Sequence, residues 1–193
     1  SEAIRLDPGS AYAYVRRALA RTRLGRLDDA IADADKALEL EPSYAAAFDA
    51  KGLALLDQGL ADAAITQFES AIEADSEYAD AYNNRGTVYS GLGQPQTALD
   101  DFAQAIALDD TYAEAYNNRG AAYLNLLQPE TAIYDFDRAI QLQPNFSSAY
   151  NNRGATLFNL GNFEQSLSDF NEALRLYYLQ NHYRSPLPWG PQA

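Results

Sequence analysis

The residues that could carry out catalysis are few in this 193-residue chain and poorly placed for it. There is one histidine, His182, and no cysteine, which excludes thiolate catalysis, disulfides and the usual Cys/His zinc sites. Carboxylates are abundant, but pairs such as Asp100 and Asp101 are adjacent and would point about 100° apart on a helix. No glycine-rich phosphate loop follows a strand. We therefore predict a protein that is not an enzyme and that needs no cofactor and no metal.

Asparagine pairs form the most regular polar pattern in the chain. The string Y-N-N-R-G begins at Tyr82, Tyr116 and Tyr150, an interval of 34 residues each time. A carboxamide both donates and accepts hydrogen bonds, which suits it to hold an extended peptide by its backbone. Alternatively, these amides hydrogen-bond to neighbouring helices and only solvate the surface. The spacing leaves both interpretations open.

Arginine and aspartate recur at the same interval. The basic positions are Arg17, Lys51, Arg85, Arg119 and Arg153. Sixteen residues after each of them come Asp33, Gln67, Asp101, Asp135 and Asp169. Both residue types change together in the second copy, so we interpret them as structural salt bridges between helices. Arginines that are free to bind a ligand are the alternative.

These spacings belong to a repeat of 34 residues that covers most of the chain. We divide it into five copies, at 11–44, 45–78, 79–112, 113–146 and 147–180. Apolar residues within each copy are three and four apart, which predicts two helices per copy. Glycine marks the turn between them in four copies, and Leu127 takes its place in the fourth. Pro95 and Pro129 fall where a second helix could begin, and Pro42 and Pro144 where one would stop.

The pattern resembles the tetratricopeptide repeat (TPR) family, which has aromatic residues at repeat positions 4, 11 and 24, small residues at 8, 20 and 27, and proline at 32. The resemblance implies an all-α fold, a right-handed superhelical solenoid of antiparallel helix pairs. The first copy departs from it, with Arg21 at position 11 and Ala34 at position 24, so we expect that copy to be the least well packed.

In this family the first helices line a concave groove. The resemblance therefore implies a peptide-binding groove, mainly in copies three to five, formed by Asn83, Asn84, Thr87, Asn117, Asn118, Ala121, Leu124, Asn125, Asn151, Asn152, Phe158 and Asn159. Chaperone-binding members of the family hold a carboxylate with Lys and Arg at groove positions. This chain has Asn, Thr and Ser there, which argues against such a clamp.

Both ends of the chain break the repeat. Residues 1–10 match positions 25–34, which suggests the second-helix remnant of a preceding repeat and excision from a longer protein. Residues 181–193 form a Pro-rich tail in which no covering helix can form. We expect Tyr177, Tyr178, Leu179 and Tyr183 to extend the last helix. Leu187 and Trp189 then fold back, insert into a neighbour's groove, or stay disordered.

The net charge of −13 disfavours nucleic acid as a partner, and no apolar stretch is long enough to insert into a membrane. The leading hypothesis is a non-catalytic protein–protein interaction scaffold that binds an extended peptide or helix in its concave groove. The alternative is a homo-oligomeric self-assembly module acting through uncapped ends and through charge asymmetry, because arginines cluster in the first copy and acids in the second. That asymmetry can equally be ordinary solvated surface. The identity of the partner and the compartment stay open.

Overall fold

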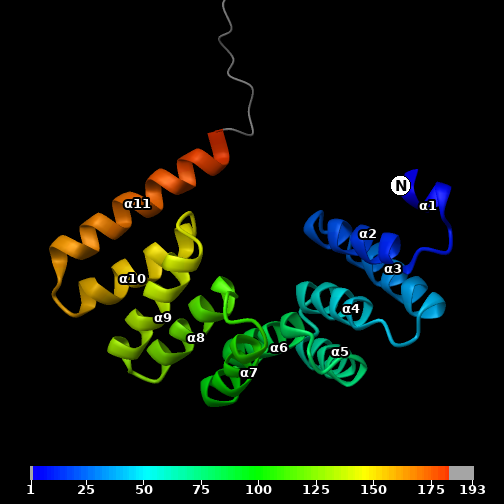
Figure 1. The fold of residues 1–193 in the computed structure, drawn as a ribbon, viewed down its shortest axis with the longest axis horizontal. Coiled ribbons are helices and arrows are strands. Elements are labelled where there is room, and N and C mark those ends of the chain that lie inside the picture. Colours follow the sequence, from blue (N-terminus) through cyan, green and yellow to red (C-terminus); the bar gives the residue numbers. More distant parts are fainter. Residues whose placement is uncertain (1, 183–193) are drawn as a thin grey trace, which may run out of the picture. The chain divides into compact units, whose positions relative to one another are not determined.

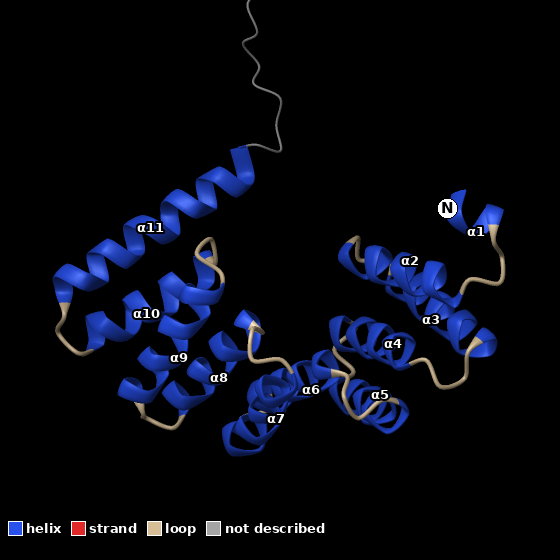
Figure 2. Ribbon diagram, in the orientation of Figure 1, coloured by secondary structure: helices blue, strands red, loops and turns tan. Residues whose placement is uncertain are grey.

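The computed structural model describes the backbone of residues 2–182 and the side chains of residues 4–179. The regular elements in that range are eleven helices, and no strand occurs among these residues (Figure 2). In chain order the helices are α1 (Glu2–Leu6), α2 (Ala11–Arg23), α3 (Leu27–Leu40), α4 (Ala45–Asp57), α5 (Ala61–Ala74), α6 (Ala79–Gly91), α7 (Pro95–Leu108), α8 (Ala113–Asn125), α9 (Pro129–Leu142), α10 (Ser147–Asn159) and α11 (Phe163–His182). They form two compact units: unit 1 contains α1–α7 and unit 2 contains α8–α11 (Figure 1).

Each repeat is one pair of helices joined by a short turn. The pairs are α2–α3, α4–α5 and α6–α7 in unit 1, and α8–α9 and α10–α11 in unit 2 (Figure 1). Pro95 and Pro129 are the first residues of α7 and α9, as predicted. Helices α3 and α9 end two residues before Pro42 and Pro144, because the residue before a proline disfavours helical backbone. The predicted all-α fold of paired helices is confirmed.

Small residues let the two helices of a pair approach closely. The alanines at positions 20 and 27 are fully buried in the first four repeats, and Phe68, Phe102 and Phe136 fill the space beside them. The glycine at position 8 lies directly against such a ring. A Cβ atom on Gly120 would lie 2.7 Å from Cε1 of Phe136, so even alanine would force the ring to move.

The turn between the two helices of a pair requires a left-handed backbone. Four repeats place glycine there, and the φ angle of Gly93 is 73°. The fourth repeat adopts the same conformation with Leu127, whose φ is 58° and whose side chain is 88% exposed. This turn is therefore set by the geometry of the repeat even where the residue is unfavourable.

The first repeat has a polar side chain, Arg21, where the family pattern has an aromatic one. Ala34 is fully buried, and Arg21 donates hydrogen bonds to the carboxylate of Asp33 and to the main-chain oxygen of Asp29. These hydrogen bonds join α2 to α3 in the first repeat. That this repeat is the least well packed stays a prediction.

The last helix is longer than its counterparts. α11 has 20 residues, whereas the other second helices have 14. It includes Tyr177, Tyr178 and Leu179, as expected, and continues through His182, two residues into the segment assigned to the tail. Tyr183, Leu187 and Trp189 lie outside the described residues. The division into five repeats with a preceding remnant at residues 1–10 stays a prediction.

Candidate functional site

The recurring arginines and aspartates form the predicted ion pairs. Arg119 on α8 donates from Nε to Oδ2 and from Nη2 to Oδ1 of Asp135 on α9, both at 2.8 Å. The same two-bonded geometry joins Arg17 to Asp33, Arg85 to Asp101 and Arg153 to Asp169. In the second repeat Lys51 pairs instead with Asp35 at 2.7 Å.

Burial makes these pairs structural. Asp135 is 1% exposed, and the aromatic ring at position 4 lies beside the guanidinium, with the Tyr116 centroid 5.4 Å from Cζ of Arg119. Hydrogen bonding to Asp135 raises the pKa of Arg119 above its ordinary value. Because the Nε–Nη2 edge of each of these four arginines is bonded to an aspartate of the fold, that edge is not available to clamp a carboxylate ligand.

In unit 1 one of the two predicted asparagines bonds to a neighbouring helix. Asn84 on α6 donates from Nδ2 to Oδ1 of Asp49 on α4 at 2.8 Å. Asn83 is buried, and the hydroxyl of the exposed Thr87 donates to its main-chain oxygen at 2.9 Å. Burial raises the pKa of Asp49 to about 7, and the hydrogen bond from Asn84 only partly opposes this shift.

Unit 2 repeats that arrangement and extends it. Asn152 on α10 donates from Nδ2 to Oδ1 of Asn117 on α8 at 2.9 Å, and Asn117 donates to Oδ1 of Asn118 at 3.3 Å. Asn117 is only 7% exposed. The amide at position 6 of one repeat is therefore bonded to position 5 of the preceding one, which supports the structural interpretation for Asn84 and Asn152.

The remaining predicted residues of unit 2 have separate surroundings. Ala121 and Leu124 are half-buried on α8, whereas Asn125 and Asn159 are exposed near the ends of α8 and α10. Phe158 is exposed but packs edge-on against Phe163, with ring centroids 5.3 Å apart. Only Asn151 and Asn152 of the predicted set line the cavity described next.

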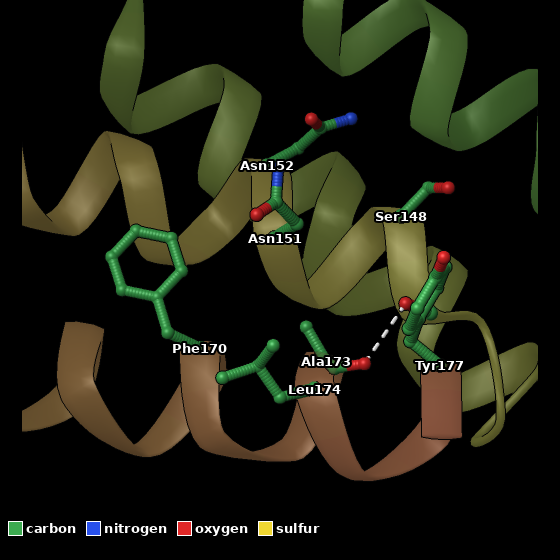
Figure 3. Close-up of a pocket in the computed structure, with 8 residues that line it drawn as sticks. Ser148, Asn151, Asn152, Phe170, Ala173, Leu174 and Tyr177 are labelled. Carbon is green, nitrogen blue, oxygen red and sulfur yellow. Dashed lines mark hydrogen bonds between the residues drawn. The ribbon is translucent and has the colours of Figure 1, made fainter. Parts of the chain in front are cut away.

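A cavity of about 630 Å³ lies between α10 and α11 (Figure 3). Its lining comprises Ser147, Ser148, Asn151, Asn152, Phe170, Ala173, Leu174 and Tyr177. The α10 side is polar, with the exposed carboxamide of Asn151, and the α11 side is apolar. Leu174 is 55% exposed and Tyr177 is 58% exposed. Ser147 ties the two helices together by donating from Oγ to the main-chain oxygen of Ala173 at 3.1 Å. This α10–α11 pocket combines apolar contact area with an amide that can both donate and accept.

The pocket is open because no further helix pair packs on α10 and α11 within the part of the chain that the structure describes. Position 28 is half-buried in the other four repeats but exposed at Leu174. The groove pattern did not indicate the α11 side of the pocket. A signal was present at position 31, where Glu41, Asp75, Asp109 and Gln143 give way to Tyr177.

These features define a helical-repeat scaffold: paired helices, buried alanines at positions 20 and 27, and amide hydrogen bonds between successive repeats. The family model for the tetratricopeptide repeat matches residues 11–44, 79–112, 113–146 and 147–177, and a second TPR repeat model matches residues 52–93. The chain belongs to the tetratricopeptide repeat family. Proteins of this family are in general non-catalytic scaffolds for protein–protein interactions, and this chain has that fold. No curated protein matched the chain in a sequence comparison.

Several solved structures share this fold. MamA is 27% identical with a TM-score of 0.70, over 85% of this chain and 96% of MamA. YrrB, described as a TPR protein with an unusual peptide-binding site, is 28% identical with a TM-score of 0.62, over 94% of this chain and 93% of its own. The first TPR of Spaghetti (RPAP3), bound to the HSP90 peptide SRMEEVD, is 31% identical with a TM-score of 0.59, over 61% of this chain and 94% of its own.

The described part of the chain contains neither a membrane-spanning helix nor a cluster of metal-ligating side chains. None of its helices is both long enough and apolar enough to cross a membrane. Its His, Asp and Glu side chains form no group of three that could hold a metal ion.

Proposed function

We propose that this protein binds an extended peptide or a helix of a partner protein on the face of unit 2 that α8 and α10, the first helices of its two pairs, form. The α10–α11 pocket is the anchor site. The observation that carries this proposal is the exposure of Leu174 and Tyr177 beside the exposed amide of Asn151. Covering partly exposed apolar side chains with a partner lowers the free energy by about 25 cal/mol for each Å² of apolar surface removed from water. Asn151 can at the same time bond to the backbone of the bound segment.

The lining favours a neutral, apolar anchor in the partner. None of the described side chains that line the pocket is charged, and the nearby Arg153 is bonded to Asp169 and Asp137. The described lining therefore offers no cationic side chain to pair with the carboxylates of an acidic segment, such as the SRMEEVD peptide bound by the Spaghetti (RPAP3) domain. A leucine or aromatic side chain flanked by hydrogen-bonding backbone fits the site better.

The rigidity of the surface supports binding without prior ordering. The Asn152–Asn117 bond and the Ser147–Ala173 bond join the helices around the pocket before any ligand arrives. A preformed site reduces the entropy that the receptor loses on binding. The other groove residues predicted in unit 2, Asn118, Ala121, Leu124 and Asn125, would contact the segment beyond the anchor.

Selection of displayed random peptides against the purified chain tests this proposal. We expect the selected peptides to share an apolar or aromatic anchor and to carry no acidic consensus. Fluorescence polarisation with one selected peptide should show that Leu174→Asp weakens binding by about 10-fold or more, because one apolar anchor is worth at least about 1.4 kcal/mol. The matched control is Leu24→Asp at the exposed residue that directly follows α2 in unit 1, which should leave the affinity unchanged. Equal binding by the Leu174→Asp variant would refute the proposal.

Self-assembly is a second candidate, favoured by the charges of α2. This helix contains four arginines and no acid. Arg17 and Arg21 are bonded to Asp33, whereas Arg16 and Arg23 are exposed. Static light scattering at low and high salt tests the idea: oligomers that dissociate with added salt and are abolished by Arg16→Glu with Arg23→Glu would support it. A monomer at all salt concentrations would contradict it.

A further inference from the structure

We propose that residues 183–193 of this same chain occupy the α10–α11 pocket, so that a partner segment must displace them. The regulatory half of this inference rests on the proposed function, whereas the contact between tail and pocket can be tested without any partner.

Helix α11 ends close to the pocket. Tyr177 lines the pocket and lies five residues before His182, which corresponds to about 7.5 Å along the helix axis. Leu174 lies eight residues before His182, or about 12 Å. A chain folding back from His182 therefore needs to cover only these distances.

The apolar residues of the tail lie within that reach. Leu187 is five residues beyond His182 and Trp189 is seven beyond, so an extended chain carries them up to about 16 Å and 23 Å from the helix end. Both values exceed the distance back to Leu174. The tail is therefore long enough to bring either residue back to the pocket.

The composition of the tail suits an aromatic, neutral pocket. Pro186, Pro188 and Pro191 exclude a helix and favour an extended polyproline conformation, which loses little entropy on binding. Segments of this kind dock in grooves lined by aromatic residues, and Phe170 and Tyr177 supply two rings here. An extended proline-rich backbone has free carbonyl oxygens, which Asn151 can bond as a donor.

Trp189 makes the contact measurable because it is the only tryptophan of the chain. Its fluorescence, excited at wavelengths where tyrosine does not absorb, reports whether the indole is buried. In the full-length chain we expect blue-shifted emission and protection from acrylamide quenching at low protein concentration. Leu174→Asp should shift the emission to longer wavelength and increase quenching, whereas the matched control Leu24→Asp should change neither.

A second variant removes any dependence on how the repeats fold. Leu187→Asp changes only the tail and should release Trp189 in the same way, while Gln192→Asp, which adds the same charge without removing an apolar group, should not. Red-shifted, fully quenched emission in the unaltered chain would overturn the inference. Blue-shifted emission that appears only at high protein concentration would also overturn it, because the tail would then occupy a second copy.

Truncation after His182 connects the contact with partner binding. If the tail competes, the truncated chain should bind a selected peptide about 10-fold more tightly than the full chain, since the pocket is then always available. Exposed Trp189 together with peptide binding that still depends on Leu174 would refute the tail contact and leave the proposed function standing. Protected Trp189 together with unchanged peptide affinity would uphold the contact and refute the pocket as the partner site.

Discussion

Asn152 donates a hydrogen bond of 2.9 Å to Oδ1 of Asn117, a residue 35 positions earlier in the chain. The bond from Asn84 to Asp49 in unit 1 spans the same 35 positions. Within each unit, these bonds tie the first helix of one repeat to the first helix of the repeat before it. The amides therefore contribute to the stacking of repeats, in addition to any contact they make with a partner.

Removing one amide should distinguish the structural asparagine from its neighbour. Asn152→Ala takes the donor away from the buried Oδ1 of Asn117 and should lower the free energy of unfolding by about 1–2 kcal/mol. Asn151→Ala at the exposed neighbouring position should leave stability within about 0.5 kcal/mol of the unaltered chain. Urea denaturation followed by circular dichroism measures both, and equal effects would contradict the assignment.

Removing one member of a buried ion pair should strongly destabilise the protein. Arg119→Ala leaves the carboxylate of Asp135 buried without its counter-ion and should cost about 3 kcal/mol or more. Arg175, whose pair with Glu172 lies on the surface of α11, provides the control. Arg175→Ala should not change the melting temperature measurably. An unchanged melting temperature for the Arg119 variant would refute the structural role of this pair.

Leu127 is the one turn residue among residues 4–179 that adopts the left-handed conformation without being glycine. Replacing it with glycine relieves backbone strain of about 1–2 kcal/mol, and the greater freedom of glycine in the unfolded chain offsets part of that gain. Leu127→Gly should therefore stabilise the protein by about 0.5–1 kcal/mol, since the side chain buries almost nothing. The reciprocal change Gly93→Leu should destabilise it by about 1 kcal/mol. Thermal unfolding of the two variants should move in opposite directions.

Asp49 should make stability depend on pH. The folded protein raises the pKa of this carboxyl from its ordinary 3.8 to about 7, so the native state holds a proton that the unfolded state releases. The contribution of Asp49 is therefore most favourable below pH 4 and is lost as the pH rises through 7. Asn fits this position, because Asn83 and Asn117 are buried at the equivalent place in the next two repeats.

Asp49→Asn should thus stabilise the protein by ~2 kcal/mol at pH 8, with the gain shrinking as the pH falls towards 4. The hydrogen bond accepted from Asn84 is preserved, since a carboxamide oxygen also accepts. Asp57→Asn, at an exposed position of the same helix, is the control and should show no such trend with pH. Chemical denaturation at a series of pH values measures the difference, and a gain independent of pH would argue against an ionised, buried Asp49.

Much of the fold could be predicted from the residues because the repeat is dictated by local packing. A 34-residue period with alanine at position 27 and a large ring at position 24 permits one arrangement of two close helices. The Arg–Asp pairing was also predictable, since both members change in the same repeat. The departure from the family pattern at Arg21 was visible too, but its hydrogen bonds to Asp33 and Asp29 depend on side-chain geometry that no pattern encodes.

The candidate site was only partly predictable. Asn151 and Asn152 are adjacent, chemically identical and part of the same string, so the sequence by itself assigned them to one groove. The tertiary structure separated them, because consecutive residues of a helix point about 100° apart. Both line the open pocket beside Leu174 and Tyr177, but Asn152 is also bonded to Asn117 of the preceding repeat, whereas Asn151 is exposed. The period determined that the helices would stack, and only the packed structure decided which amide the stacking uses and which it leaves exposed.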